Sequence, residues 1–242
     1  MDLGGKVALV TGGARRVGAA IVEALASRGA TVAIHYNSSS TDAEALSARL
    51  PGSAVFQSDL HDPLAAETLP RRVIAELGRL DVVVNSASVM IRQELGSVTP
   101  EDWDQVHAIN VRAYFFVAQG AADALKTARG TLINVSDLSG TEAWPAYIPH
   151  SASKAGVDAL TKGLARALAP DVRVNAIAPG AVLLPDDWGQ PEADEIIRTT
   201  PLRRLGSPAD VVRAVEYLID AEYTTGTTLV VDGGRLLAPR TK

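Results

Sequence analysis

Short apolar runs rich in β-branched residues alternate along the chain with longer segments in which apolar residues recur at helical spacing. This alternation predicts βαβ units, in which helices cover both faces of a parallel sheet. The short runs predict seven strands, over residues 6–10, 31–35, 54–57, 81–85, 131–136, 173–178 and 228–231. The expected fold is therefore α/β, with one doubly wound parallel sheet.

The longer segments predict the helices that connect these strands. Residues 17–28 place apolar side chains on one helical face, and Gly29 follows as a stop signal. Residues 100–125, 151–168 and 208–219 show the same spacing, and the first and last of these begin with a proline, which suits the first turn of a helix. Four principal helices are therefore expected.

One stretch fits neither pattern. Residues 179–203 contain prolines at positions 179, 185, 191 and 201. An irregular segment of this length in a compact domain is usually functional, so we expect a substrate lid there. No repeat or linker divides the rest of the sequence, and residues 1–242 are expected to form a single domain.

Composition excludes several classes of function. The 23 Lys and Arg residues against 28 Asp and Glu residues give a net charge of −5, without the basic cluster that a nucleic-acid partner requires. There is no cysteine and the four histidines are scattered, so we expect neither disulfides nor a metal. The longest nearly apolar stretch, residues 176–185, is shorter than the roughly 20 residues that span a bilayer. The N-terminus lacks the pattern of a targeting signal, so no membrane partner and a cytoplasmic location are expected.

A glycine-containing turn follows the first predicted strand and precedes the first predicted helix. It reads TGGARRVG over residues 11–18. Glycines at such a turn let the backbone approach a pyrophosphate, and the helix N-terminus offers free N–H groups and partial positive charge. The alternative is a glycine-rich turn without a ligand. The context of strand, turn and helix favours a dinucleotide-binding sheet of the Rossmann type.

The end of the second strand indicates which dinucleotide is bound. It reads Tyr36-Asn37-Ser38 and carries no acid. An acid there would bind the ribose diol of NAD(H) and repel the 2′-phosphate of NADP(H). Arg15 and Arg16 are expected near the same ribose, although they could also be a solvated surface pair. The sequence therefore favours NADP(H) as cofactor.

Several further motifs, taken together with this turn, identify a family. Asn85-Ser86-Ala87-Ser88 follows the fourth strand, Asn110 lies within an apolar helical stretch, Pro179-Gly180 follows the sixth strand, and Asp232-Gly233-Gly234 follows the seventh. Over nearly its whole length the sequence resembles the short-chain dehydrogenase/reductases. The resemblance implies cofactor contacts from Thr11, Gly12, Arg15, Arg16, Val17, Gly18, Tyr36, Asn37, Ser38, Asp59, Leu60, Asn85, Ser86, Ala87, Lys154, Pro179 and Gly180.

Within that family the chain looks most like the pteridine and dihydromonapterin reductases. Those enzymes carry an arginine where Arg16 stands, and an Asn-x-Ala-Ser run such as residues 85–88. They also place an aspartate where most relatives have the catalytic serine. Counting back from Lys154 at the family's spacing puts His150 at the tyrosine position and Asp137 at that aspartate position. The resemblance implies an NADPH-dependent reductase of a pterin or similar flat C=N or C=O compound.

The catalytic residues implied by this resemblance are Asp137, His150, Lys154 and Asn110. His150 and Lys154 stand four residues apart at a helix start and share one face, so both can reach the nicotinamide ribose. Imidazole is a general acid near neutral pH, and Asp137 could pass a proton through water, because its apolar sequence neighbours predict a raised pKa. The alternatives are that Asp137 caps a turn, that His150 packs at the helix start, and that Asn110 bonds to the backbone.

The substrate side is assigned to Ser88, Met90, Tyr147 and Trp188. Met90 stands where pteridine reductases place an aromatic ring, Tyr147 is expected as a wall of the pocket, and Trp188 could close over a flat substrate. The resemblance also implies a homotetramer. Two other functions stay open: a general carbonyl or alcohol dehydrogenase, and an NADP(H)-binding protein with little or no turnover.

Overall fold

A central parallel sheet of seven strands organises the chain. A computed structural model describes residues 1–184 and 189–237. The strands are β1 (Val7–Thr11), β2 (Thr31–Tyr36), β3 (Ala54–Gln57), β4 (Val82–Asn85), β5 (Thr131–Val135), β6 (Arg173–Pro179) and β7 (Thr228–Val231). Their order in the sheet is β3-β2-β1-β4-β5-β6-β7, and each neighbouring pair is parallel. The predicted doubly wound, Rossmann-type α/β fold is confirmed, and each strand ends within one residue of its predicted bounds.

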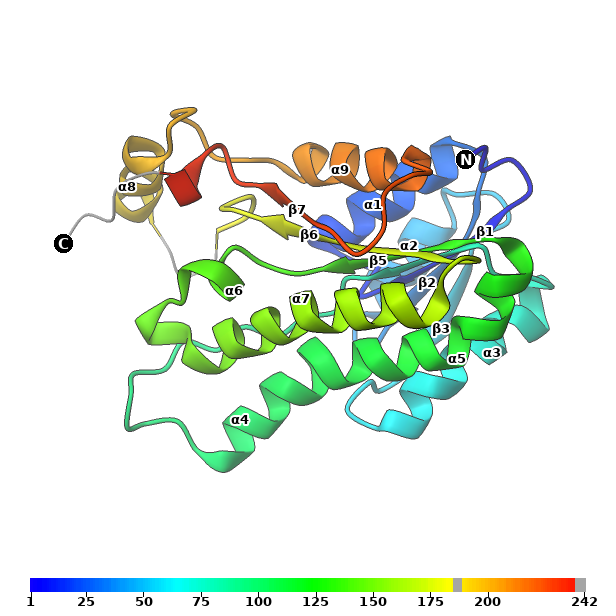
Figure 1. Cartoon of the computed structure of the whole chain (residues 1–242), viewed down its shortest axis with the longest axis horizontal. Helices are drawn as coiled ribbons and strands as arrows, with labels where there is room; N and C mark the ends of the chain where they lie inside the picture. Colours follow the sequence, from blue (N-terminus) through cyan, green and yellow to red (C-terminus); the bar gives the residue numbers. More distant parts are fainter. Residues whose placement is uncertain (185–188, 238–242) are drawn as a thin grey trace.

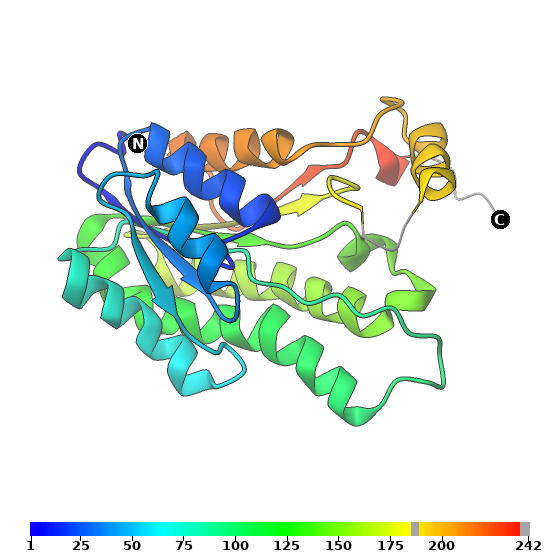
Figure 2. The same cartoon turned by 180° about the vertical axis from the view of Figure 1, so that it is seen from behind.

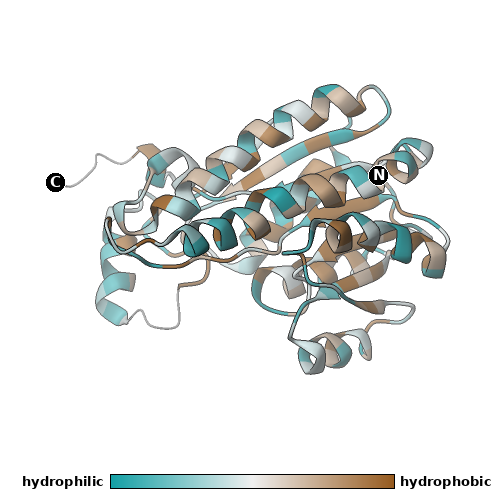
Figure 3. Cartoon of the chain, turned by 90° about the horizontal axis from the view of Figure 1, so that it is seen from below, coloured by the Kyte–Doolittle hydropathy of each residue, from teal (hydrophilic) through white to brown (hydrophobic). Residues whose placement is uncertain are grey.

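Helices cover both faces of this sheet (Figures 1 and 2). On one face lie α1 (Arg16–Ser27), α2 (Ser40–Ser47) and α9 (Pro208–Asp220). On the other face lie α3 (Pro63–Leu77), α5 (Ala113–Ala128) and α7 (Ile148–Leu168). Both faces of the inner strands are therefore buried under apolar side chains, as is typical of a parallel sheet, whereas the edge strands β3 and β7 are partly exposed. Hydrophilic and hydrophobic residues alternate along the helices (Figure 3).

The chain connection reverses direction between β1 and β4, which pair with each other in the middle of the sheet. In open α/β sheets such a switch leaves a crevice outside the carboxyl ends of the strands. The loops that follow β1, β2, β4, β5 and β6 surround this crevice. The fold thus brings the predicted motifs to one edge of the sheet.

The predicted helix over residues 100–125 is interrupted. The structure divides it into α4 (Pro100–His107), a π-helical turn (Ala108–Arg112) and α5. Thr99 begins α4 with a capping box, in which its hydroxyl accepts the N–H of Asp102 and the Asp102 carboxylate accepts the N–H of Thr99. A π-helical turn holds one extra residue and commonly marks a functional site.

The expected irregular stretch over residues 179–203 is partly helical. Residues 190–199 form α8 (Gln190–Thr199), whose N-terminus is capped by the carboxylate of Glu192 accepting the N–H of Gly189. Pro191 lies in its first turn, where a missing N–H costs nothing, so this proline starts a helix instead of preventing one. The expectation of a continuous loop there was wrong.

The remaining elements are short: α6 (Ser139–Glu142), a 3₁₀ turn at Pro145–Tyr147 and another at Arg235–Leu237. No helix in residues 1–184 and 189–237 is long and apolar enough to cross a membrane. The same part of the chain contains no group of three or more His, Asp or Glu side chains that could hold a metal ion.

Candidate active site

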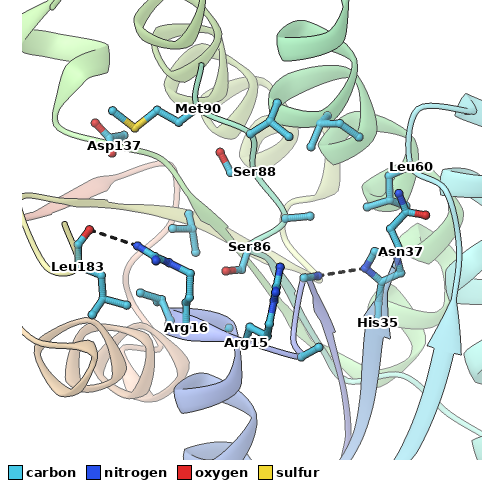
Figure 4. A pocket seen from close by; sticks show the side chains of 18 of the residues that line it. Arg15, Arg16, His35, Asn37, Leu60, Ser86, Ser88, Met90, Asp137 and Leu183 are labelled. Carbon is cyan, nitrogen blue, oxygen red and sulfur yellow. Dashed lines mark hydrogen bonds between the residues drawn. The ribbon is translucent and has the colours of Figure 1, made fainter. Parts of the chain in front are cut away.

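A cavity of about 540 Å³ opens at the carboxyl ends of the strands (Figure 4). Its lining includes Gly12, Arg15, Arg16, Val17, Gly18, Tyr36, Asn37, Ser38, Leu60, Ser86, Ala87, Ser88, Met90, Asp137, His150, Lys154, Pro179 and Gly180. Met90, Ser88 and Asp137 lie toward one end, whereas His35, Asn37 and Leu60 lie toward the other (Figure 4). Residues from distant parts of the sequence therefore meet in one elongated site.

The glycine-containing turn forms the floor of this cavity. Gly12 has φ +63°, and a Cβ atom at this position would come within 2.9 Å of the Cα of Ala87. A Cβ on Gly18 would collide with the carbonyl oxygen of Gly12. The first turn of α1 has neither a side-chain cap nor an acidic residue. Its N–H groups and positive dipole end therefore fit an anion such as a dinucleotide pyrophosphate.

The two arginines of the turn diverge. Arg16 has φ +54°, and its guanidinium donates to the carbonyl oxygens of Leu183 and Leu184 at 3.4 and 3.3 Å. Figure 4 shows the Arg16 side chain extended toward Leu183. The Nε atom of Arg15 lies 3.8 Å from a carboxylate oxygen of Asp42 on α2. Both arginines line the cavity, and the expectation that they approach one ribose stays a prediction.

His35, a residue that sequence reasoning did not assign to the site, lies at the end of β2. Its side chain is 2% exposed, yet it contributes to the cavity lining. Its Nδ1 accepts the N–H of Gly12 at 3.0 Å, and its Nε2 lies 3.0 Å from the carbonyl oxygen of Ser58. Burial lowers the pKa of His35 to about 4, although the Ser58 carbonyl acts to raise it. The only signal in the sequence is a polar residue within an apolar strand.

Three predicted cofactor residues lie outside the lining. The hydroxyl of Thr11 accepts the N–H groups of Ser86 and Ala87, so it fixes the loop after β4. Asn85 is fully buried and donates to Asn134 at 3.0 Å. These two side chains support the lining from behind.

The third, Asp59, is exposed beside the cavity. Its carboxylate accepts the backbone N–H of His61 at 3.0 Å and lies 2.9 Å from the Nδ1 of that ring. These hydrogen bonds lower the pKa of Asp59. The neighbouring Leu60 and His61 line the cavity, so Asp59 organises this segment.

Lys154 lies on α7, deep in the cavity. It is 2% exposed, and its Nζ donates to the carbonyl oxygen of Val135 at 2.8 Å. Burial lowers the pKa of Lys154 to about 8, against the opposing charges of Asp137 and Asp158. Lys154 therefore remains cationic at neutral pH.

Asp137 and His150 face each other across the same end. The Nε2 of His150 lies 3.9 Å from the Oδ2 of Asp137, and the Oδ1 of Asp137 accepts the N–H of Ser139 at 2.7 Å. Burial alone would raise the pKa of Asp137, but His150, the Ser139 N–H and Lys154 together hold it below its ordinary value. The raised pKa expected from its apolar sequence neighbours was therefore wrong, and Asp137 is ionised at neutral pH.

The His150 ring is fixed through its other nitrogen. His150 is 3% exposed, and its Nδ1 lies 3.1 Å from the carbonyl oxygen of Val89. Among the described residues, its Nε2 has no hydrogen-bond partner. A buried imidazole nitrogen without a partner is costly unless a ligand or water completes it. This atom is therefore available to bond a group that enters the cavity.

Asn110 projects from the π-helical turn and holds this arrangement from behind. Its Oδ1 accepts the hydroxyl of Ser88 at 3.0 Å and the N–H of Val89 at 2.8 Å. Its Nδ2 donates to the carbonyl oxygen of Val89 at 2.9 Å and to the Ser153 hydroxyl at 3.0 Å. Its Nδ2 also lies 3.2 Å from the Nδ1 of His150, so the amide contacts both the backbone of Val89 and side chains of the site.

The four predicted substrate residues have different positions. Ser88 and Met90 line the cavity, and Met90 is 40% exposed. Tyr147 does not line it, because its ring is buried and packs edge-on against Trp144 at 6.1 Å between ring centroids. The expectation of Tyr147 as a wall of the pocket was wrong. Trp188 lies outside the described residues.

Comparisons with known proteins agree with this geometry. A family model described as enoyl-(acyl carrier protein) reductase matches residues 12–235. A protein of Streptomyces violaceoruber described as ketoacyl reductase 2 of the granaticin polyketide synthase is 36% identical over 236 residues, which cover 94% of this chain and 95% of that protein.

Two solved structures have nearly the same fold. A blue fluorescent protein from a metagenomic library, in complex with NADPH, has a TM-score of 0.91 and 33% identity, covering 97% of this chain and 99% of that one. A short-chain dehydrogenase/reductase mutant from Serratia marcescens has a TM-score of 0.90 and 34% identity, with the same coverage of 97% and 99%. The chain therefore belongs to the short-chain dehydrogenase/reductase family of NAD(P)-dependent oxidoreductases.

Proposed function

We propose that the protein reduces a ketone of a small, flat molecule with NADPH, and that His150 is the proton donor in place of the family's tyrosine. The observation that carries this proposal is the buried Nε2 of His150, which lacks a partner among the described residues and lies 3.9 Å from Asp137. Lys154 lines the same cavity. An acid, a carboxylate counter-ion and a buried cation around one space suit the transfer of a proton to a developing alkoxide.

The cavity fits NADPH along its length. The glycine-containing turn and the N-terminus of α1 suit the pyrophosphate, and the ammonium of Lys154 suits the nicotinamide ribose. When bound, the cofactor supplies a hydride to the carbonyl carbon. The blue fluorescent protein that this chain resembles is in complex with NADPH, which supports the same assignment here.

Which nitrogen of the His150 ring carries a hydrogen determines whether the ring can donate a proton. The Nδ1 of His150 lies 3.1 Å from the carbonyl oxygen of Val89, which only accepts, and 3.2 Å from the Nδ2 of Asn110, which only donates. The two hydrogens of that amide make shorter bonds to Val89 and Ser153, so the Nδ1 of His150 carries a hydrogen for the Val89 carbonyl. In the neutral ring Nε2 then holds a lone pair, and only the imidazolium form has a proton to give from Nε2. The carboxylate of Asp137 lies 3.9 Å from Nε2, so a proton there has a counter-ion. The carbonyl oxygen takes this proton as the hydride reaches the carbon, which gives an alcohol and a neutral imidazole.

The proposed preference for NADPH over NADH is based on the residues at the C-terminal end of β2. Tyr36, Asn37 and Ser38 line the cavity there, and none of them carries a negative charge. Arg15 lines the cavity nearby and supplies a cation for a 2′-phosphate. NADPH is therefore expected to bind more tightly than NADH in a titration, and equal affinities would contradict this preference.

Pterin reduction is the second candidate, and the position of Asp137 favours it. The Oδ2 of Asp137 lies beside the Nε2 of His150 at the cavity surface. A carboxylate there can accept a hydrogen bond from an N–H next to a reducible C=N bond, while His150 supplies a proton. The relative of Streptomyces violaceoruber is described as a ketoacyl reductase, which favours a ketone over a pterin as the substrate. The homotetramer and the cytoplasmic location stay predictions.

The test is NADPH oxidation with 1-tetralone, an acetoacetyl thioester and dihydrobiopterin, measured beside a titration of NADPH binding. Turnover of either ketone above that of the pterin is expected. Turnover of dihydrobiopterin alone would replace the ketone with the pterin. Tight binding of NADPH without any turnover would contradict both and favour the cofactor-binding interpretation. The His150→Phe variant separates the proposed chemistry from background reduction, since it should bind NADPH without reducing the substrate.

A further inference from the structure

We propose that His35 is a positioning residue for the dinucleotide. Its neutral imidazole fixes the Gly12 peptide and the Ser58 carbonyl relative to each other. One ring thereby fixes the backbone at both the phosphate end and the adenine end of the cavity. This inference rests on the proposed use of NADPH. It concerns the opposite end of the cavity from His150, and it adds a residue that no motif of the sequence assigns.

The two contacts of His35 define one protonation state. The Gly12 N–H can only donate, so the Nδ1 of His35, at 3.0 Å, holds a lone pair. The Ser58 carbonyl oxygen can only accept, so the Nε2, at 3.0 Å, carries the hydrogen. A single neutral tautomer makes both bonds, and a second proton would abolish the bond to Gly12. Figure 4 shows the bond from His35 to the turn.

The contact with Gly12 acts where the backbone has little freedom. Gly12 adopts φ +63°, and its Cα side packs against Ala87. The backbone of residue 35 supports the next peptide, because its carbonyl oxygen accepts the N–H of Gly13 at 2.9 Å. The side chain and the main chain of His35 thus hold two successive peptides of the turn. The direction of these peptides decides how the turn and the start of α1 meet a pyrophosphate.

The contact with Ser58 links the turn to the adenine end. Ser58 is buried, follows β3 and precedes Leu60 and His61, which line the cavity. Its own N–H donates to the carbonyl oxygen of Tyr36 at 3.1 Å. The ends of β1, β2 and β3 are therefore connected through the ring and backbone of the His35–Tyr36 segment. Such a connection, already in place before the ligand binds, reduces the cost of ordering the site.

Three substitutions separate the two contacts. In His35→Asn the amide oxygen takes the place of Nδ1 and keeps the bond to Gly12, but the shorter side chain does not reach Ser58. In His35→Gln the amide N–H takes the place of the Nε2 hydrogen and keeps the bond to Ser58 without accepting from Gly12. His35→Phe keeps the ring and loses both bonds. The half-buried His107 on α4, whose ring stacks on Trp103 outside the cavity lining, offers a control, His107→Asn.

The measurement is the Kd for NADPH, from cofactor fluorescence or calorimetry without substrate, with the thermal unfolding midpoint of each variant. His35→Phe, which loses both bonds, should raise the Kd about tenfold or more, and His35→Gln and His35→Asn, which each lose one, should raise it roughly threefold or more. His107→Asn should leave the Kd unchanged.

A merely structural role would give a different result. It would lower the unfolding midpoint of all three His35 variants while each folded variant kept the wild-type Kd, and this outcome would overturn the inference. If the wild-type protein bound neither NADPH nor NADH, the proposed function would fail, and the inference would fail with it. If the wild type bound NADPH but showed no turnover, only the proposed chemistry would fail, and the Kd series would still decide the role of His35.

Discussion

Two histidines lie at opposite ends of one cavity and are buried almost equally, at 2% exposed for His35 and 3% for His150. They differ in their partners. Both ring nitrogens of His35 are occupied, by the Gly12 N–H and the Ser58 carbonyl. His150 is held only through Nδ1, and its Nε2 has no partner among the described residues.

This difference separates an imidazole that positions its neighbours from one that can react. A ring with two satisfied nitrogens gains nothing from a ligand and cannot change its proton count without losing a bond. A ring with one free nitrogen and a carboxylate 3.9 Å away can exchange a proton. Burial alone does not distinguish the two roles; the count of partners does.

The largest expected effect follows from removing the reactive ring. His150→Phe keeps an aromatic side chain but removes the proton donor, and kcat should fall about 10²- to 10⁴-fold. The Kd for NADPH should change little, because His150 makes no contact with the glycine-containing turn. Steady-state kinetics and a binding titration measure the two quantities. A loss of kcat below tenfold would show that another group protonates the product.

The second effect concerns stability and belongs to His35. The unfolded chain binds a proton on this ring near pH 6.5, whereas in the folded protein burial lowers the pKa of His35 to about 4. The contribution to stability is therefore complete above pH 6.5 and is lost as the pH falls toward 4, by roughly 3 kcal/mol over this window. Denaturant unfolding across the window should show a shallower dependence in His35→Asn, which does not titrate. Equal slopes would contradict the prediction.

The third effect is a displaced pH profile. His150→Tyr places a phenol, whose ordinary pKa is about 10, where the imidazolium acts. Reduction in the wild type should slow as the pH rises, because the neutral ring has no proton on Nε2. In the variant this decline should move upward by roughly two pH units or more. A pH series of kcat measures the shift, and an unchanged profile would count against His150 as the acid.

The smallest effect comes from the counter-ion. Asp137→Asn removes the negative charge that lies 3.9 Å from the Nε2 of His150, so the rate at pH 7 should fall about tenfold. The Ser139 N–H keeps an oxygen acceptor in this variant, so the local backbone is preserved. A rate at pH 7 equal to that of the wild type would contradict the assigned role.

The fold followed from the sequence because its signals are local. Each strand is an apolar run bounded by polar or turn residues, and a parallel sheet buries such runs on both faces. The helices that escaped prediction have weaker patterns: α2 is short and rich in serine, threonine and acids, and α3 contains Pro70 in its interior. The π-helical turn leaves no mark in hydrophobic spacing, since it only inserts one residue.

The site was predictable where a motif carries it and not where contacts cross the sheet. The spacing of Asp137, His150 and Lys154 placed them on one strand end and one helix face, and they do line one cavity. The lowered pKa of Asp137 arises from His150, thirteen residues later, and from Lys154. Its apolar sequence neighbours therefore gave the wrong direction for this pKa. His35 owes its place to Gly12 and Ser58, each 23 residues away, and a single sequence does not reveal such pairs.

The π-helical turn at Ala108–Arg112 has a consequence for what changes in length this chain tolerates. Deleting one residue there would restore a regular helix, but every residue beyond it would rotate by about 100° around the axis. The side of α5 that carries Tyr114, Val117 and Ala121 would then turn away from the sheet. If α5 kept its packing after such a deletion, the residues before it would rotate instead, and Asn110 would move away from the loop after β4. The residue count of this turn is therefore fixed from both of its ends.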